Sequence, residues 1–228
     1  APSLLAAAQA LMPNATPHTP YGMTECLLVT DVTLEVIEEA AASTDAGVCV
    51  GRPIGANRVL LSALDASGAA TGVPSDAPGV LGEILVSAPH LKQGYDRLAL
   101  TDRDAVRGTP AHPLLDERAQ RASRREPAPS TSRWHRTGDV GHLDADGRLW
   151  IEGRLPHVLV TADGPVAPVG PEQDVERVDA VRRAAVVGVG PHGLQQAVAV
   201  VETVEGSRSA GLADVELAAA VRASTSLP

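Results

Sequence analysis

The sequence predicts an α+β protein that is divided into more than one domain. Its 228 residues are enough for one large domain or two modest ones. Short apolar runs separated by Gly, Pro and Asp fill the middle of the chain, a pattern typical of a small β-barrel or sandwich. Strand-like and helical patterns alternate in the last third, which indicates a small α+β unit that begins near Gly153.

The N-terminal part is predicted to hold two helices and one short strand. Apolar residues at helical spacing predict both helices, Pro13 ends the first, and Thr33 can cap the second. The expected elements are a helix at 1–12, an extended entry at 19–20, a loop at 21–25, a strand at 26–30 and a helix at 31–44.

The middle part is predicted to be mainly β. The turn at Asp146-Gly147 lies between apolar runs, which is a strong hairpin signal. Residues 102–133 are poor in apolar side chains and rich in Arg, Pro and Ser, so we expect a mobile surface loop there rather than an anion-binding patch. The expected strands are 58–64, 79–87, 140–143 and 148–152.

The C-terminal part is predicted to alternate strands and helices. A GxGxxG pattern at 188–193 follows a strand, as in dinucleotide-binding proteins. Pro191 and the immediate return of a strand leave no room for the helix that such a site needs, so a strand-to-strand loop is expected. The expected elements are strands at 157–161, 184–189 and 196–203, and helices at 171–178 and 213–223.

Composition excludes several classes of function. The net charge of −9 argues against nucleic acid or an anionic membrane as a partner. No apolar run approaches the ~18 residues of a membrane span, so no integral membrane segment is expected. Cys26 and Cys49 lack CxxC spacing and are expected to be reduced and buried, as in a cytoplasmic protein. The seven His residues show no metal-ligand spacing, and the sequence predicts no zinc site.

Two polar stretches offer binding chemistry. Tyr21, Gly22, Thr24 and Glu25 combine a planar ring, a flexible backbone, a hydroxyl and a carboxylate, a set that can stack on a base, contact a phosphate and hold a hard cation. An ordinary polar loop contains the same residue types, and composition leaves both interpretations open. Asp139 is expected in a loop just before a strand, where its carboxylate can accept hydrogen bonds from both hydroxyls of a ribose.

Taken in order, these stretches resemble the motifs of the adenylate-forming superfamily, which contains acyl-CoA synthetases, luciferases and the adenylation domains of peptide synthetases. Tyr21–Glu25 comes first, Trp134–Asp139 follows, and Gly153-Arg154 comes last. Gly82–Val86 resembles a GELLV-type strand that lies between these motifs, and Val186–Val189 resembles an AVVGV strand of the family's C-terminal domain. Each motif is short, and it is their shared order that makes the resemblance specific.

The resemblance implies an enzyme that uses ATP to activate a carboxylic acid, with ATP or AMP and Mg²⁺ as cofactors and a small acyl substrate as partner. Whether coenzyme A takes part stays open. Thr24 and Glu25 would be catalytic, with Thr24 on the α-phosphate and Glu25 as the metal ligand. The nucleotide would be bound by Tyr21 against the adenine, Asp139 on the ribose, Arg154 at a hinge between two domains, and by Gly22 and Thr24.

The resemblance also implies that parts of the family lie outside this sequence. The family's phosphate loop is expected before residue 1 and its catalytic Lys after residue 228; Lys92, the single Lys, stands elsewhere. The chain is therefore expected to be a fragment that is inactive alone and depends on the missing segments of its parent. The expected divisions are the tail of a large α/β adenylation domain at 1–46, a small distorted β-barrel at 47–152 and an incomplete α+β lobe at 153–228.

Within the superfamily, the hinge at 153–157 and the sequence of residues 134–144 most resemble those of OleC-type β-lactone synthetases. These enzymes adenylate a long-chain β-hydroxy acid and close it to a β-lactone. Leu155 stands where the family usually has Asp or Lys, and the loop at 161–166 lacks the usual basic residues, which fits loss of thioester chemistry. The alternatives are a fatty acyl-CoA synthetase or acyl-AMP ligase, and a non-catalytic binding module on the same fold.

Overall fold

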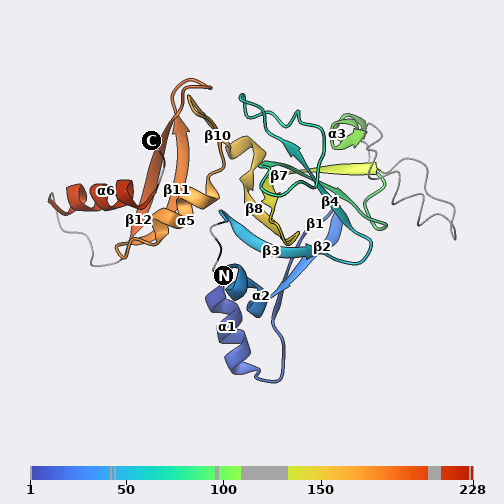
Figure 1. The fold of residues 1–228 in the computed structure, drawn as a ribbon, viewed down its shortest axis with the longest axis horizontal. Helices are drawn as coiled ribbons and strands as arrows, with labels where there is room; N and C mark the ends of the chain where they lie inside the picture. The colour runs from blue at the N-terminus through green and yellow to red at the C-terminus, as the bar shows by residue number, and fades with distance from the viewer. Residues whose placement is uncertain are drawn as a thin grey trace.

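The computed structural model describes residues 2–41, 43, 45–95, 98–108, 133–204, 212–225 and 227. It confirms the α+β class, and Figure 1 shows the C-terminal lobe in orange and red beside a large sheet, with two N-terminal helices in blue below it. The elements are α1 (Pro2–Leu11), β1 (His18–Met23), β2 (Cys26–Thr33), α2 (Leu34–Ala40), β3 (Val48–Pro53), β4 (Arg58–Ala63), β5 (Gly82–Ser87), α3 (Ala99–Asp104), β6 (Val106–Gly108), β7 (Arg133–Leu143), β8 (Leu149–Arg154), the 3₁₀ turn η1 (Leu155–His157), β9 (Leu159–Thr161), β10 (Gly164–Val166), α5 (Val169–Glu176), β11 (Val181–Val189), β12 (Gln196–Thr203) and α6 (Leu212–Ser224).

Strands β1 to β8 form one antiparallel sheet in the order β1-β2-β3-β8-β7-β5-β4, with β6 paired to β7. Within the described residues β1 and β4 end this order and do not pair with each other, so the sheet is open and the expected small distorted β-barrel is not closed. A loop meets the outer edge of β4 instead, through bridges from Leu61 to Ser75 and from Leu64 to Ala70. These bridges satisfy backbone groups that barrel closure would otherwise pair.

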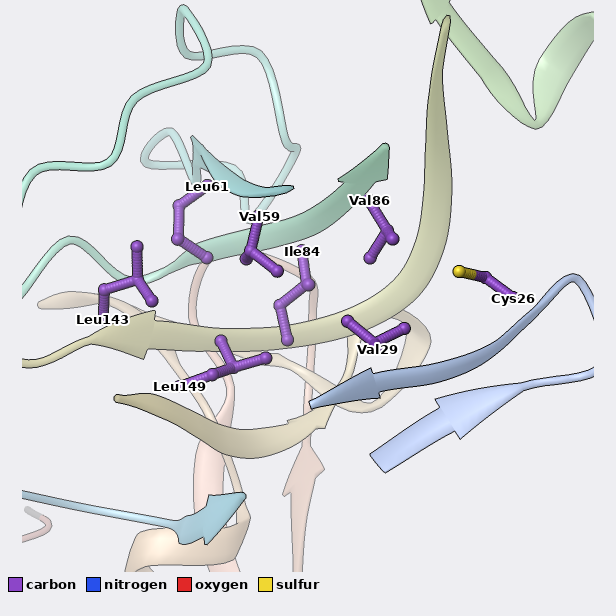
Figure 2. Packing of buried hydrophobic residues seen from close by; sticks show 8 residues of the cluster. All are labelled: Cys26, Val29, Val59, Leu61, Ile84, Val86, Leu143 and Leu149. Carbon is purple, nitrogen blue, oxygen red and sulfur yellow. The ribbon is translucent and has the colours of Figure 1, made fainter. Parts of the chain in front are cut away.

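Strands β4 and β5 are buried on both faces of the sheet, because side chains alternate along a strand. One face holds Leu60, Leu85 and Trp134. The opposite face holds the larger core, whose buried side chains come from β2, β4, β5, β7 and β8 (Figure 2). Its buried members are Cys26, Val29, Val59, Leu61, Ile84, Val86, Leu143 and Leu149.

The polar stretch at 21–25, expected as a loop, forms the end of β1 and the turn of a β-hairpin. Tyr21 pairs with Thr30, and Met23 pairs with Cys26 on β2. The sequence reasoning missed β1 because His18–Met23 contains Pro20 and Gly22 and has no apolar alternation. Its position comes from pairing with β2, which was predicted correctly but is longer than expected.

Helix α2 confirms the predicted cap and corrects the predicted length. The backbone N–H of Val36 donates to Thr33 Oγ1 at 3.4 Å, as an N-cap hydroxyl should accept it. The helix begins at Leu34 rather than residue 31, because residues 31–33 continue β2. It ends at Ala40, which packs on Cys49 and Trp150.

Strand β7 is much longer than the predicted strand at 140–143 and includes the stretch that was expected as a loop. Thr137 to Asp139 stand opposite the single residue Ile84 of β5, where the pairing shifts. Gly138 has a φ of +71°, which suits the bulge this shift creates. Thr137 Oγ1 donates to the Ile84 carbonyl at 2.9 Å and accepts from the Asp139 N–H at 3.0 Å. The polar residues are therefore a bulge within a strand.

Among the described residues, the C-terminal part of the chain after η1 contains two hairpins and two α-helices. The GxGxxG stretch begins at the end of β11 and continues into the loop before β12. The two strands pair antiparallel from Val189 and Gln196 onward, so the predicted strand-to-strand loop is confirmed. Val186 is buried, and its N–H donates to Glu172 of α5 at 2.9 Å. Val187 and Val198, on the other face of this hairpin, are exposed. None of the described helices is long and apolar enough to cross a membrane.

The expected mobile loop at 102–133 lies largely outside the described residues, which omit 109–132. Its first residues belong to α3 and β6 rather than to a loop, and Arg133 already belongs to β7. The expected division at residues 1–46, 47–152 and 153–228 stays a prediction. Strands β1 and β2, from the first of these parts, hydrogen-bond to β3 of the second.

Candidate active site

Asp139 is the centre of a group of polar side chains contributed by three strands. Tyr21 Oη donates to Asp139 Oδ2 at 2.6 Å, and Arg154 Nη1 donates to Asp139 Oδ1 at 2.7 Å. Both carboxylate oxygens therefore accept charge-assisted hydrogen bonds. Tyr21 comes from β1, and the structure thus joins residues that are 118 positions apart in the sequence.

The hairpin of β7 and β8 sets the distance between Asp139 and Arg154. The two residues are direct partners in its register, and the register shifts just beyond them, between Val140 and Gly141. The Asp139 side chain is 12% exposed and the Arg154 side chain 58%. The ion pair consequently joins a fixed carboxylate to a guanidinium that faces solvent and is free to move to another acceptor.

Tyr21 is held as a neutral phenol. Burial of the ring and, next, the negative charge of Asp139 raise the pKa of Tyr21 well above its ordinary value. The phenol therefore keeps its proton and acts as a donor to Asp139 across the physiological range. A neutral, oriented ring at this position can present a flat face to a planar ligand.

Glu25 lies in the hairpin turn that follows Tyr21 and belongs to a separate group. Tyr95 Oη donates to Glu25 Oε1, and the Lys92 backbone N–H donates to the Glu25 carbonyl at 2.8 Å. The hydrogen bond from Tyr95 lowers the pKa of Glu25, and His135 and Lys92 add smaller effects in the same direction. The carboxylate is therefore ionised at neutral pH and has the chemistry of a ligand for a hard cation.

The other two predicted residues, Gly22 at the end of β1 and Thr24 in the turn, differ in how accessible they are. Thr24 is exposed, which leaves its hydroxyl accessible to a phosphate. Gly22 is enclosed, because a Cβ built on it would lie 2.9 Å from the Cys26 carbonyl oxygen and 3.2 Å from Leu27. Gly22 therefore serves the close approach of β1 and β2, and any contact that it makes with a ligand would be through its backbone.

Sequence reasoning missed Tyr95, Lys92 and His135 as members of the Glu25 group. Lys92 and Tyr95 lie in a bend after β5, with no local pattern that indicates a site. His135 is buried on β7 and its Nδ1 has no hydrogen-bond partner within the described residues. The nearest available signal was the rarity of aromatic residues, since Tyr95 is one of only two Tyr in the chain.

A second buried polar group lies further along the same hairpin. His142 Nδ1 is 2.7 Å from Glu152 Oε1, and its Nε2 is 3.2 Å from Asp45 Oδ1. Its ring stacks on Trp150, with centroids 6.0 Å apart. Burial lowers the pKa of His142, but the hydrogen bonds and charges of Glu152 and Asp45 outweigh it, so the pKa lies above its ordinary value. This geometry gives His142 a structural role in the hairpin.

We expect this group to make stability depend on pH. Because the folded state raises the pKa of His142 above an unfolded value of about 6.5, its contribution is complete below about pH 6.5 and is lost as pH rises through the folded pKa. Chemical denaturation of the full-length protein between pH 5.5 and 8.5 measures this loss. His142→Gln should flatten that part of the profile, and an unchanged profile in the variant would contradict the assignment.

The described residues hold no preassembled cluster of metal ligands and no activated thiol. No group of three or more His, Cys, Asp or Glu side chains is arranged to hold a metal ion within the described residues. Cys26 and Cys49 are free and buried, as predicted from their spacing. Burial raises the pKa of both thiols, so neither is an activated nucleophile.

The chain is similar in sequence and in structure to known enzymes. No protein-family model matches the chain. The chain is 37% identical over 222 residues to an olefin beta-lactone synthetase of Xanthomonas campestris pv. campestris, a match that covers 95% of this chain and 37% of that protein. The structure superposes on the amide bond synthetase McbA of Marinactinospora thermotolerans with a TM-score of 0.66 and 27% identity, over 97% of this chain and 37% of that one.

The chain belongs to the adenylate-forming superfamily. The family resemblance seen in the order of the sequence motifs is thereby confirmed. The same fold occurs in the O-succinylbenzoate coenzyme A synthetase of Bacillus subtilis, solved in complex with ATP and magnesium, with a TM-score of 0.63 and 20% identity over 94% of this chain and 37% of that one. This adenylate-forming chain therefore spans little more than a third of the length of the relatives it matches.

Proposed function

We propose that the full-length protein adenylates a long-chain β-hydroxy acid with ATP and closes the acyl-adenylate to a β-lactone. The observation that carries the nucleotide part is the convergence of Tyr21 and Arg154 on Asp139, which gathers three residues of separate sequence motifs into one group. The substrate class is supported by the 37% identity to an olefin beta-lactone synthetase along almost the whole chain.

In this proposal Asp139 accepts hydrogen bonds from the ribose hydroxyls and Tyr21 lies against the adenine. The two oxygens of Asp139 accept from Tyr21 and Arg154, so a ribose must take over at least one of these positions. Arg154 is the partner that can leave, because its side chain is largely exposed and Tyr21 is enclosed. Its guanidinium would then donate to the ribose, and Gly22 would add only backbone contacts.

The donor set of the hairpin turn fits a nucleotide bound with magnesium. Glu25 supplies an ionised carboxylate and Thr24 an exposed hydroxyl, so Glu25 would hold Mg²⁺ and Thr24 would contact the α-phosphate. Magnesium bound there would supply charge neutralisation at the phosphates. The two residues of this chain would serve to orient the phosphate and to keep its position fixed during the reaction.

The reaction balances in two steps. A carboxylate oxygen of the acid attacks the α-phosphorus of ATP, the bond to the β-phosphate breaks, and pyrophosphate leaves. The β-hydroxyl then attacks the acyl carbon and loses its proton, the bond between that carbon and the AMP oxygen breaks, and AMP leaves with the β-lactone. Coenzyme A has no role in these steps.

We also propose the three-part division at residues 1–46, 47–152 and 153–228, with Arg154 at the second boundary. The direct step from β8 into η1 at Arg154 supports a pivot there, because the extended strand ends at that residue. A cytoplasmic location is part of the same proposal and is supported by two free, buried Cys residues.

The test is product analysis with the full-length protein, ATP, Mg²⁺ and a long-chain 3-hydroxy acid, with and without coenzyme A. We expect AMP, pyrophosphate and a β-lactone in equal amounts, independent of coenzyme A. A thioester that forms only with coenzyme A would contradict the β-lactone assignment. No ATP-dependent AMP release with any β-hydroxy or fatty acid would contradict adenylation itself.

A further inference from the structure

A bend after β5 lies directly on the hairpin turn that carries Glu25. Leu91 of this bend packs against the main core, and its N–H donates to the Ala88 carbonyl at 3.2 Å. The next residue, Lys92, donates its backbone N–H to the Glu25 carbonyl at 2.8 Å. The bend is therefore anchored on both the core and the turn, although it contains no helix or strand.

Tyr95 lies on this anchored bend and contacts the Glu25 side chain. Its hydroxyl donates to Glu25 Oε1, and the two residues are 70 positions apart in the sequence. The ammonium group of Lys92 lies 3.4 Å from the centroid of the Tyr95 ring, a cation–π geometry that restrains the ring. The orientation of the Tyr95 ring is thus restrained by Lys92 on the same bend, independently of the contact with Glu25.

We infer that Tyr95 is a positioning residue for the metal-binding carboxylate, which rests on the proposed function of Glu25. By occupying Oε1, the phenol holds the carboxylate in one orientation and directs Oε2 toward a cation. Mg²⁺ requires near-ideal octahedral geometry and binds through one or two carboxylates together with phosphate oxygens and water. A ligand whose orientation is already fixed avoids the cost of being ordered when the metal binds.

Two features separate this role from simple packing. The phenol is a neutral donor, so it holds the carboxylate without cancelling the charge that a cation needs. The hydrogen bond also joins residues whose backbones are already held together by the Lys92 N–H. Loss of the hydroxyl should therefore leave the bend in place and free only the carboxylate.

The experiment is Tyr95→Phe in the full-length protein, with pyrophosphate release measured against free Mg²⁺ at saturating ATP and 3-hydroxy acid. We expect the Mg²⁺ concentration for half-maximal rate to rise by about 10-fold, as loss of a partner to a metal ligand typically causes. Excess Mg²⁺ should restore most of the rate. The matched control is Thr161→Val, which removes a hydroxyl that donates to the Gly164 carbonyl at 3.0 Å in the distant hairpin of β9 and β10 and should leave the Mg²⁺ dependence unchanged.

A second measurement keeps the result decisive if Tyr95→Phe lowers stability. In the Glu25→Gln background, where the carboxylate is absent, Tyr95→Phe should change calorimetric ATP binding at fixed Mg²⁺ by less than about twofold. A fall in melting temperature with an unchanged Mg²⁺ dependence would overturn the inference and leave Tyr95 a packing residue. If the unmodified protein released no pyrophosphate at all, the proposed function would fail, and that outcome is distinct from either result with Tyr95.

Discussion

Asp139→Ala in the full-length protein should weaken ATP binding or transition-state stabilisation by about 2–4 kcal/mol, because a ribose would lose a charged acceptor of two hydrogen bonds. This corresponds to a fall of roughly 30- to 1000-fold in kcat/KM for ATP. Steady-state kinetics at varied ATP measures the change. The variant also leaves Tyr21 and Arg154 without their shared acceptor, so thermal stability should be measured beside activity.

Asp76→Ala provides the matched control for this prediction. Asp76 is an exposed carboxylate in the loop that meets β4, and its replacement removes the same charge from the surface. We expect its kcat/KM for ATP to stay within about twofold of the unmodified protein, as is usual for surface substitutions. An Asp139→Ala variant with unchanged KM and kcat for ATP would count directly against the ribose assignment.

Gly141→Ala should cause the largest loss of stability, about 3 kcal/mol or more. A Cβ built on Gly141 falls almost on the Trp150 carbonyl oxygen of the paired strand β8, so the two strands must separate. Asp139 and Arg154 are partners in the same hairpin and would move apart with them. Denaturant unfolding measures the stability, and ATP kinetics on the fraction that stays folded measures the effect on the site.

Gly79→Ala separates steric overlap from backbone conformation. Gly79 has a φ of +73°, and a Cβ built on it meets no atom within 4 Å. Its replacement should therefore cost only the ~1–2 kcal/mol of placing Ala in the left-handed region. Equal losses in Gly141→Ala and Gly79→Ala would show that close packing of β7 on β8 does not limit stability.

Local signals were enough to predict much of the fold. Helical spacing predicted α1, Thr33 marked the start of α2, and Asp146-Gly147 marked the turn between β7 and β8. Each of these signals acts within a few residues, so a single sequence contains it completely. Strand β1 had no such signal, because a short polar segment with Pro and Gly becomes a strand only when β2 pairs with it.

Prediction of the candidate site was likewise limited by contacts between residues far apart in the sequence. Tyr21, Asp139 and Arg154 could be singled out from the sequence because each stands in a recognisable stretch, and the structure brings the three together. Their contact with a nucleotide stays a prediction. The bulge at Thr137–Asp139 was read as a loop because polar residues and Gly occur in both, and only the register with β5 distinguishes them. Tyr95 was missed because its contact with Glu25 depends on a bend 70 positions away.

The predicted small distorted β-barrel is an open sheet within the described residues. Short strands with Gly and Pro turns are shared by barrels and open sheets, so the pattern cannot tell them apart. A sheet closes into a barrel only when its first and last strands pair. In the described part of the chain, β4 instead forms a bridge with the loop around Ser75. That pairing is a long-range property with no signature in the composition of either strand.

An oxygen-labelling experiment tests the central proposal most directly. The full-length protein would be given ATP, Mg²⁺ and a long-chain 3-hydroxy acid with ¹⁸O in both carboxylate oxygens, and the products analysed by mass spectrometry. Attack of the carboxylate on the α-phosphorus, followed by ring closure through the hydroxyl, predicts one ¹⁸O in AMP and one in the lactone carbonyl. Unlabelled AMP with both labels in the lactone, or no AMP at all, would contradict the account.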